Sequence, residues 1–337
     1  MRLTWAAARV PALRTALAVL SVSVLVSGCH VPGTSASGAA SGSGPITVAF
    51  VPGIDNAPLS VAVSDGLFQQ AGLKVTVKQY PSLSAEYQAL TSGQAQIAVG
   101  DYTGFLYKQA TGHASLRLIA DGYDAAPNSV AILTLPGSGI TTPQQLGQAV
   151  SVATPPGQLI TATESAPYNV QTLAAEEVLQ NDGVSPSSVT WSQMQPQNLI
   201  GALRSGQVKA ILVTEPYILE AEQQLGAVEV VDASTGVTSG LPMSGYFSLE
   251  NYAHEHPSAV LAFQKALDQA QSACAQRGAV QAVLPKLTGM STEDAALVTL
   301  GTYPASLNVG QVQRVASLMY DSGMISSPVS MNRLTSG

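Results

Sequence analysis

The chain has 337 residues, which exceeds what one hydrophobic core usually organises and suits two domains. Only 10% of the residues are charged and the formal net charge is −7, so this acidic chain without basic clusters excludes nucleic-acid binding and electrostatic docking to anionic lipid. Two cysteines, Cys29 and Cys274, exclude a disulfide framework.

The first 28 residues have the pattern of a lipoprotein signal peptide. Basic residues precede an apolar run at 16–26, which is too short for an ordinary membrane-spanning helix. The run ends in Val26-Ser27-Gly28-Cys29, which resembles a bacterial lipobox and implies lipidation of Cys29. Residues 29–44 are mostly Gly, Ser, Ala and Thr and predict a flexible tether. We therefore expect a lipid-anchored protein on the outer face of the cytoplasmic membrane, with a plain signal peptide as the alternative.

From residue 45 onward, strand-like apolar runs alternate with helical patterns. Strands are predicted at 46–51, 74–79, 97–99, 116–121, 130–135, 150–153, 189–194, 208–213, 228–231 and 246–249. Helices are predicted at 59–67, around 87–90, and at 104–110, 170–178, 199–203, 217–225 and 260–274, with short helices in the remainder to about residue 324. Thr142, Pro143 and Gln145 predict a helix start with a capping box. This order predicts an α/β fold with largely parallel sheets and a helical tail that packs on the first lobe.

Two stretches, 89–101 and 202–216, carry the same features in the same order. In each, a helix ends at a glycine, Gly93 or Gly206, an apolar strand follows, and an acidic residue, Asp101 or Glu215, stands just after it. Open α/β sheets bind ligands at the carboxyl ends of their strands. The repeated pattern therefore predicts two similar lobes around one cleft, with Asp101 and Glu215 facing one ligand from opposite sides. Chance similarity in an Ala/Ser/Gly/Gln-rich chain is the alternative.

Four motifs, taken in order, resemble those of the lipoprotein solute-binding subunits of ABC importers for nitrate, taurine, alkanesulfonates and thiamine pyrimidine precursors. They are Ala62 with the run from Asp65 through Gly66-Leu67-Phe68 to Val75; the run 89–100; Gly139-Ile140 with Leu146-Gly147 and 150–153; and Ala202-Leu203 with Gly206 and 214–217. The family's usual Lys is replaced by Gln148 and its usual acidic residue by Gln96, at two positions expected to face solvent. The resemblance covers roughly residues 46–263.

The resemblance implies a type II periplasmic-binding-protein fold, in which two α/β lobes close on a ligand by hinge bending. It implies one lobe of residues 45–135 and 245–337, a second lobe of residues 136–244, and crossovers near 134–138 and 238–245. The implied partners are a small-molecule ligand and the permease and ATPase subunits of an importer. A monomer without cofactor, metal or catalytic residues is expected.

Residues at strand ends and in the following loops are the candidates for lining the cleft. They are Asp55, Asn56, Tyr80, Asp101, Tyr102, Tyr123, Asp124, Pro155, Gly157, Gln158, Gln195, Glu215, Tyr217 and Tyr246. This set holds four carboxylates, five tyrosines and no Lys or Arg. Such a set favours a neutral or cationic nitrogen heterocycle, and a thiamine-pyrimidine-like compound fits best. An alkanesulfonate, taurine or nitrate, held by helix N-termini, is the alternative within the family.

Two other classes stay open. Thiamine-pyrimidine synthases and menaquinone-pathway enzymes are built on the same fold, although no nucleophile elbow, P-loop or dinucleotide motif occurs here. His254 and His256 lie two residues apart without a third ligand nearby, so they do not predict a metal site. A sensor or adhesion lipoprotein without a ligand is the third class.

Overall fold

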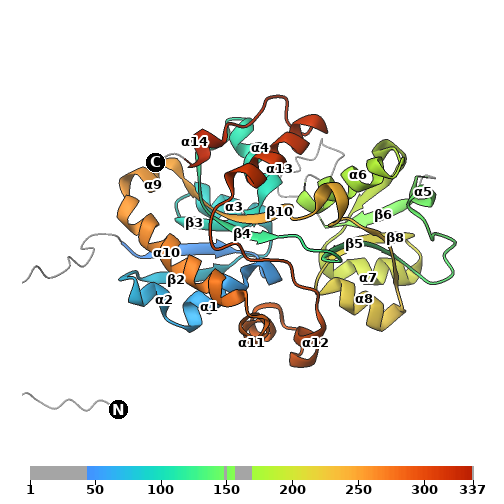
Figure 1. Ribbon diagram of the computed structural model, residues 1–337, viewed down its shortest axis with the longest axis horizontal. Coiled ribbons are helices and arrows are strands. Elements are labelled where there is room, and N and C mark those ends of the chain that lie inside the picture. Colours follow the sequence, from blue (N-terminus) through green and yellow to red (C-terminus); the bar gives the residue numbers. More distant parts are fainter. Residues whose placement is uncertain (1–43, 148–149, 156–168, 336–337) are drawn as a thin grey trace, which may run out of the picture. The chain divides into compact units, whose positions relative to one another are not determined.

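The computed structural model describes residues 44–147, 150–155 and 169–335, which belong to one compact unit that runs from residue 39 to the C-terminus (Figure 1). The predicted signal peptide, Cys29 and nearly all of the predicted tether lie outside the described residues, as do Gly157, Gln158 and Gln148. Within the described ranges, no helix has both the length and the apolar character needed to cross a membrane.

The first sheet has five strands in the order β2-β1-β3-β10-β4. They are β1 (Ile46–Phe50), β2 (Val75–Gln79), β3 (Ile97–Asp101), β4 (Leu116–Asp124) and β10 (Pro242–Leu249). Strand β1 runs parallel to β2 and β3, whereas β10 runs antiparallel to β3 and β4. The sheet is therefore mixed, because β10, which comes much later in the chain than the other four strands, runs in the opposite direction to its neighbours β3 and β4.

The second sheet repeats this arrangement in the order β7-β6-β8-β5-β9. Its strands are β5 (Val130–Thr134), β6 (Ser151–Thr154), β7 (Thr190–Gln193), β8 (Ala210–Thr214) and β9 (Val228–Asp232). Strand β6 is parallel to β7 and β8, and β5 is antiparallel to β8 and β9. Strands β3 and β8, which end the two repeated stretches, take the same central place in their sheets. The prediction of two similar α/β lobes is confirmed, and the expected largely parallel sheets are mixed.

The first crossover lies earlier than expected. Strand β5 (130–134) pairs with β8 and β9, so the chain passes from the first sheet to the second between residues 124 and 130. The expected crossover at 134–138, and with it the boundary at residue 135, is wrong. An apolar run signals burial between layers, and it does not say in which sheet the strand pairs. The return crossover, between 232 and 242, overlaps the expected 238–245.

Helices of the N-terminal half and of the C-terminal tail cover the first sheet (Figure 1). The former are α1 (Ala57–Ser64), α2 (Leu67–Gln70), α3 (Leu83–Thr91) and α4 (Tyr102–Ala110), preceded by the short 3-10 turn η1 (Ile54–Asn56). The tail forms α9 (Glu250–Glu255), α10 (Pro257–Cys274), α11 (Arg277–Thr288), α12 (Thr292–Leu297), α13 (Val309–Asp321) and α14 (Met331–Thr335). Helix α10 packs on α1 and α2, where the rings of Phe68 and Phe263 stack 4.9 Å apart. The tail therefore packs on the first lobe, as predicted.

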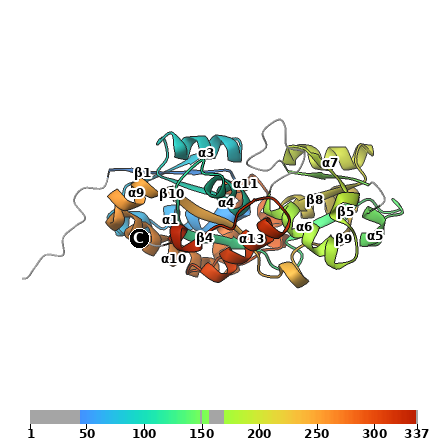
Figure 2. The same cartoon turned by 90° about the horizontal axis from the view of Figure 1, so that it is seen from above.

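The second lobe carries α5 (Pro143–Leu146), α6 (Val170–Asn181), α7 (Pro196–Ser205), α8 (Tyr217–Leu225) and the short turn η2 (Pro186–Ser188); a third turn, η3 (Gly236–Thr238), lies in the return crossover. The predicted capping box of Thr142 and Gln145 is present at α5. In the two repeated stretches, α3 packs on β3 and α7 on β8. Figure 2 shows α3 and α7 along the upper side of the molecule, with α7 above β8. Both stretches follow the predicted path, because Gly93 and Gly206 adopt φ values of +75° and +72° after their helices.

Apolar side chains at matching positions of the two stretches reach the cores. Leu90 of α3 and Leu203 of α7 are buried, as are the central strands that follow them. Gln96, expected to face solvent, is half-buried: its Oε1 accepts a hydrogen bond from the Thr47 amide at 2.8 Å. In the first lobe the rings of Phe105 and Phe247 stack 4.2 Å apart beneath the sheet. These contacts fix the positions of the strand ends that form the cavity described next.

Candidate functional site: the cavity between the strand ends

A cavity of about 670 Å³ lies where the carboxyl ends of the parallel strands in both lobes meet the N-terminal turns of the following helices. The first lobe lines it with 51–55 after β1, with 81–84 at the start of α3, with 99–101 at the end of β3, and with Tyr123, Met243, Ser244 and Thr288. The second lobe lines it with Pro155, Val170, Gln171, 195–197 at the start of α7, and 213–217 between β8 and α8. The cleft expected from the sequence is therefore a cavity shared by both lobes.

Seven of the predicted site residues line this cavity: Asp55, Asp101, Tyr123, Pro155, Gln195, Glu215 and Tyr217. They come from both lobes and from separate strand ends. The structure thus brings together residues that lie in or just after the carboxyl ends of β1, β3, β4, β6, β7 and β8.

Five other predicted side chains lie outside the lining. Tyr102 is fully buried and its hydroxyl donates to Asp121 Oδ1 at 2.6 Å. Tyr246 is fully buried in the middle of β10, because that strand begins at Pro242 and not at Tyr246 as predicted. Tyr80 is half-buried beside Lys78, whose Nζ lies 5.0 Å from the ring centroid. These three tyrosines do not line the cavity as expected, because the spacing along a chain does not say which face of a strand end a side chain takes.

The fourth, Asn56, is buried beneath the cavity and positions its neighbour. Its Nδ2 donates to the carbonyl of Val51 at 3.0 Å and to Asp55 Oδ1 at 2.8 Å. Asp124, also a candidate, lies outside the lining at the end of β4, where burial and the charge of Asp121 raise its pKa to about 7.

The sequence reasoning missed several polar lining residues. Ser82, Gln171, Gln197 and Ser244 all line the cavity. Ser82 is the N-cap of α3 and accepts from the amide of Ala85 at 3.2 Å, so an N-cap pattern directly after a predicted strand could have found it. Ser244 could not be found in this way, because Pro242 and Gly245 hid the start of β10.

Asp55 is an acidic residue of the cavity lining that its neighbour Asn56 holds in position. Burial raises its pKa to about 6, against the lowering effect of the Ser244 hydroxyl and the Asn56 amide, and the Asp101 carboxylate raises it further. Burial raises the pKa of Glu86, Tyr123 and Tyr303, and the charge of Asp55 raises each of them further. Among the described residues that line the cavity, none is Lys, Arg or His. The negative charge of Asp55 is thus uncompensated within the described lining.

Asp101 lies between the N-termini of two helices, one from each lobe. Its Oδ1 accepts from the amides of Thr103, at 2.8 Å, and Gly104, at 3.3 Å, and so caps α4. Its Oδ2 accepts from the amide of Val170, the first residue of α6 in the second lobe, at 3.0 Å. Helix N-termini favour negative charge. These bonds lower the pKa of Asp101, but burial outweighs them and the pKa is raised.

Glu215 makes the reciprocal contact from the second lobe. Its Oε2 accepts from the amide of Leu219 in α8 at 3.1 Å, and its Oε1 accepts from the amide of Thr299 at 2.8 Å. Thr299 belongs to the segment after α12, which Arg277 of α11 holds by a 2.6 Å bond to the carbonyl of Val298. Burial raises the pKa of Glu215 and the two amides lower it. Asp101 and Glu215 therefore each bind a backbone amide of the other lobe, whereas the sequence predicted that both face the ligand.

Residues 39–287 match the NMT1-like family. The chain belongs to the NMT1-like family. A curated relative, the nitrate import ATP-binding protein NrtC of a Synechocystis strain, is 26% identical in an alignment over 273 residues that covers 74% of this chain. The chain spans 38% of the length of that relative.

Solved structures share the fold of this NMT1-like protein. The periplasmic aliphatic sulphonate binding protein SsuA of Escherichia coli has a TM-score of 0.68 at 18% identity, covering 87% of this chain and 98% of that one. The periplasmic nitrate-binding protein NrtA of Synechocystis PCC 6803 has a TM-score of 0.65 at 14% identity, covering 86% and 83%. The desulfurization enzyme DSZB has a TM-score of 0.65 at 16% identity, covering 86% and 96%. The expected periplasmic-binding-protein fold is confirmed.

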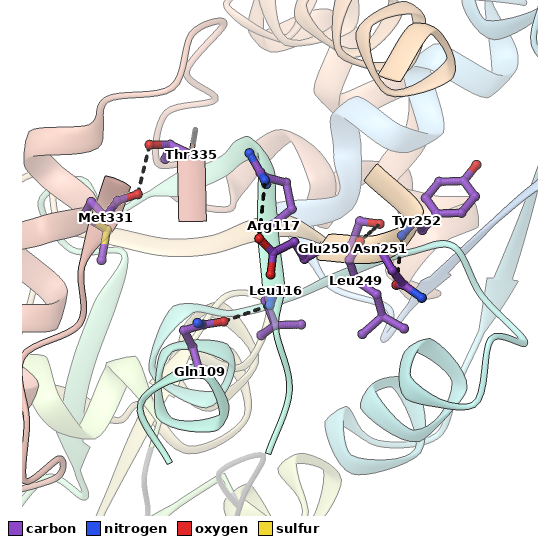
Figure 3. A network of polar contacts seen from close by, with 10 residues as sticks. Gln109, Leu116, Arg117, Leu249, Glu250, Asn251, Tyr252, Met331 and Thr335 are labelled. Atoms are coloured by element: carbon purple, nitrogen blue, oxygen red, sulfur yellow. Dashed lines mark hydrogen bonds and ion pairs between the residues drawn. The ribbon is translucent and has the colours of Figure 1, made fainter. Parts of the chain in front are cut away.

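A second cavity of the NMT1-like protein, of about 490 Å³, lies at the opposite end of the first sheet, where β4 begins and β10 ends. Arg117 of β4 faces Glu250 there at 3.9 Å, and Gln109 Oε1 accepts from the Leu116 amide at 2.8 Å (Figure 3). None of the sequence-predicted site residues lines it. Because only the first lobe lines this second cavity and no residue predicted from the sequence lies in it, the cavity that both lobes line is the candidate site.

Proposed function

We propose that this protein is the solute-binding component of an ABC importer, which captures a small organic solute between its two lobes and delivers it to a membrane permease and its ATPase. The observation that carries the proposal is the cavity of about 670 Å³ that both lobes line, with each lobe bonded to the other beside it. Hinge closure on a ligand gives such a protein its function without covalent chemistry. Membership in the NMT1-like family and the printed functions of SsuA and NrtA support it.

The chemistry of the lining favours a neutral or cationic nitrogen heterocycle of the thiamine-pyrimidine kind as the solute. Three carboxylates, Asp55, Asp101 and Glu215, line the cavity, and no basic side chain does so among the described residues. The N-termini of α4, α6 and α8, which would suit an anion, are already capped by Asp101 and Glu215. A bound anion would meet like charge there.

An alkanesulfonate, taurine or nitrate ligand is the second candidate. It is favoured by the N-terminal turns of α3 and α7, which line the cavity and carry Ser82, Ser84, Gln195 and Gln197 in place of acidic residues at the lining positions. The names of SsuA and NrtA point the same way.

A thermal-shift and calorimetry screen with 4-aminopyrimidine, taurine and nitrate tests the proposal. We expect 4-aminopyrimidine to raise the melting temperature, since a ligand at 100 times its Kd adds about 2.7 kcal/mol. If taurine or nitrate binds tightly and 4-aminopyrimidine does not bind, the solute is an anion and not a heterocycle. A chain that responds to no solute in a broad panel of heterocycles, anions and flavins is a sensor or adhesion protein and not an importer component.

An enzyme of thiamine-pyrimidine or menaquinone metabolism is the alternative of another class, and the fold of DSZB keeps it open. Mass spectrometry separates the two. A heterocycle recovered unchanged after long incubation with the protein supports binding, whereas its conversion to a product identifies an enzyme.

We also propose that Cys29 is lipidated and anchors the protein, as a monomer, to the outer face of the cytoplasmic membrane through the tether 29–44. The lipobox-like Val26-Ser27-Gly28-Cys29 supports this. Cys29→Ser is expected to abolish the lipid mass increment and membrane association in the producing cell. Cys274→Ser, which changes a buried cysteine of α10, is the matched control. A Cys29→Ser protein that fractionates and migrates like the wild type contradicts the anchor.

A further inference from the structure

We infer that the Asp55 carboxylate and the Tyr123 hydroxyl are the pair that selects the solute, with Asp55 accepting an N–H donor and Tyr123 donating to an adjacent acceptor on one edge of the ligand. The inference rests on the proposed function and goes further, because it assigns the recognition of that solute to two side chains of the first lobe.

Asp55 is held in place by residues on either side of it. Asn56 Nδ2 donates to its Oδ1 at 2.8 Å and is itself fixed by the carbonyl of Val51. On the other side, a Cβ on Gly53 would lie 2.4 Å from the same Oδ1, so a residue with a side chain there would push the carboxylate away. Only a glycine lets the carboxylate take this position at the wall of the cavity.

Of the three lining carboxylates, Asp55 takes no part in the hydrogen bonds between the lobes, so it is available to a ligand. Both oxygens of Asp101 accept backbone amides, and so do both oxygens of Glu215. Among the described residues, the hydrogen bond to the Asp55 carboxylate comes from the Asn56 side chain, which belongs to the same lobe. A ligand donor can therefore reach Asp55 without breaking a contact between the lobes.

A short series of contacts connects Tyr123 to Ile54, the residue before Asp55, and both Tyr123 and Asp55 line the cavity. The ring of Tyr303 lies 5.2 Å from the ring of Tyr123, and the Tyr303 hydroxyl donates to the carbonyl of Ile54 at 2.8 Å. Tyr123 lines the cavity while its ring is buried. Burial raises the pKa of Tyr123, and the charge of Asp55 raises it further.

The hydroxyl of Tyr123 is set up as a donor. Its oxygen accepts the amide of Gly301 at 2.6 Å, and no acceptor for its own proton is found among the described residues. Burial raises its pKa, so the hydroxyl keeps that proton at neutral pH. A phenol that already accepts one bond offers its proton to a ligand acceptor.

The pair therefore presents an acceptor that carries a negative charge next to a neutral donor. A ligand edge with an N–H or N–H⁺ group beside a ring nitrogen or carbonyl matches this order, and an aminopyrimidine has such an edge. A sulfonate or nitrate presents acceptors only and would leave Asp55 opposite a like charge. The pair thus selects heterocycles with a donor beside an acceptor.

Calorimetry with 4-aminopyrimidine at pH 7.5 tests the pair. It uses the protein without the predicted signal peptide, residues 29–337. We expect Asp55→Asn to weaken binding about 10- to 150-fold, the range for a hydrogen bond to a charged group, and Tyr123→Phe to weaken it about 3- to 10-fold. Gly53→Ala, which keeps the charge but displaces the carboxylate, is expected to weaken binding more than 3-fold. Two variants at exposed positions are the controls: Asp65→Asn, at the end of α1, and Tyr320→Phe, in α13. Both are expected to bind 4-aminopyrimidine with the wild-type affinity.

The pH dependence separates a charge contact from general damage. The ratio of wild-type to Asp55→Asn affinity is expected to fall towards one as the pH drops below about 6, where Asp55 takes up a proton. Tyr123→Phe should leave the pH profile unchanged.

Two results would overturn the inference, and they differ. If the wild type binds 4-aminopyrimidine and Asp55→Asn binds it equally well, the pair is wrong while the proposed solute class stands. If the wild type binds taurine or nitrate but not 4-aminopyrimidine, the proposed solute class and the pair both fail. Melting curves of each variant establish that the compared proteins are folded.

Discussion

Asp101 Oδ2 accepts a hydrogen bond at 3.0 Å from the backbone amide of Val170, which lies 69 residues further along the chain and in the other lobe. A carboxylate at the end of β3 thereby caps the first turn of α6. Glu215, at the end of the equivalent strand β8, binds the amide of Thr299 in the opposite direction. The two repeated stretches are thus joined by reciprocal contacts, each made by the acidic residue that marks its stretch in the sequence.

Asp101→Asn is expected to loosen the contact between the lobes. An amide NH₂ in place of Oδ2 sets donor against donor at Val170, and we expect a loss of about 1–3 kcal/mol in the free energy of unfolding. Hydrogen exchange at the Val170 amide should accelerate, and X-ray scattering should give a larger radius of gyration. Asp182→Asn, at the exposed end of the same helix α6, is the control that should change neither. Unchanged exchange at Val170 would mean that the bond does not persist in solution.

Glu215→Gln tests whether the two contacts open together. The variant should accelerate exchange at Thr299, because the amide loses a charged acceptor. If the lobes part as rigid bodies, exchange at Val170 should accelerate as well, although the Val170 amide is bonded to Asp101 and not to Glu215. Acceleration confined to Thr299 and Leu219 would contradict a concerted opening.

The sequence predicted the lobes because its local signals agree with the fold. Val48, Ile97 and Ile211 belong to short apolar runs, and Gly93 and Gly206 end the preceding helices with positive φ. These signals need only the neighbouring residues, and the two similar sheets follow from them. The position predicted for the first crossover was wrong because the run 130–134 is equally apolar whichever sheet it joins.

The cavity was predicted less completely for two physical reasons. Side chains at a strand end point alternately to the core and to the cavity, and nothing in the chain distinguishes Tyr102, which bonds Asp121 in the core, from Tyr123, which lines the site. Backbone amides such as those of Val170 and Thr299 carry no sequence signature, so the inter-lobe role of Asp101 and Glu215 could not be read beforehand. The types of residue in the site were predicted, and their contacts were not.

The ligand-free protein is expected to lose stability as the pH rises from about 5 to about 7.5. Burial raises the pKa of Asp55 to about 6 and that of Glu176 to about 7, as it does for Asp124. A raised carboxyl pKa means that the folded state binds protons more tightly than the unfolded state, so stability present at low pH is lost as the pH passes through the folded-state pKa.

Urea unfolding at pH 5.0 and 7.5 measures this slope. Asp55→Asn removes the contribution of Asp55 to this pH dependence. The variant should therefore have a larger free energy of unfolding than the wild type at pH 7.5, and this free energy should differ less between the two pH values. Asp65→Asn, at an exposed position, should keep the wild-type slope. A wild-type stability that increases from pH 5.0 to 7.5 would contradict the expectation.

Two glycines of α7 are expected to respond in opposite ways to the same substitution. Gly206 ends the helix with φ +72°, a conformation that costs a residue with a Cβ about 1 kcal/mol, so Gly206→Ala should destabilise the protein by about that amount. Gly201 lies inside the helix, and a Cβ there would meet no atom within 4 Å. Gly201→Ala should therefore stabilise the protein by roughly 0.5–1 kcal/mol through the lower backbone entropy of alanine. Thermal unfolding of the two variants checks the sign of each change, and equal signs would mean that α7 does not end at Gly206 as described.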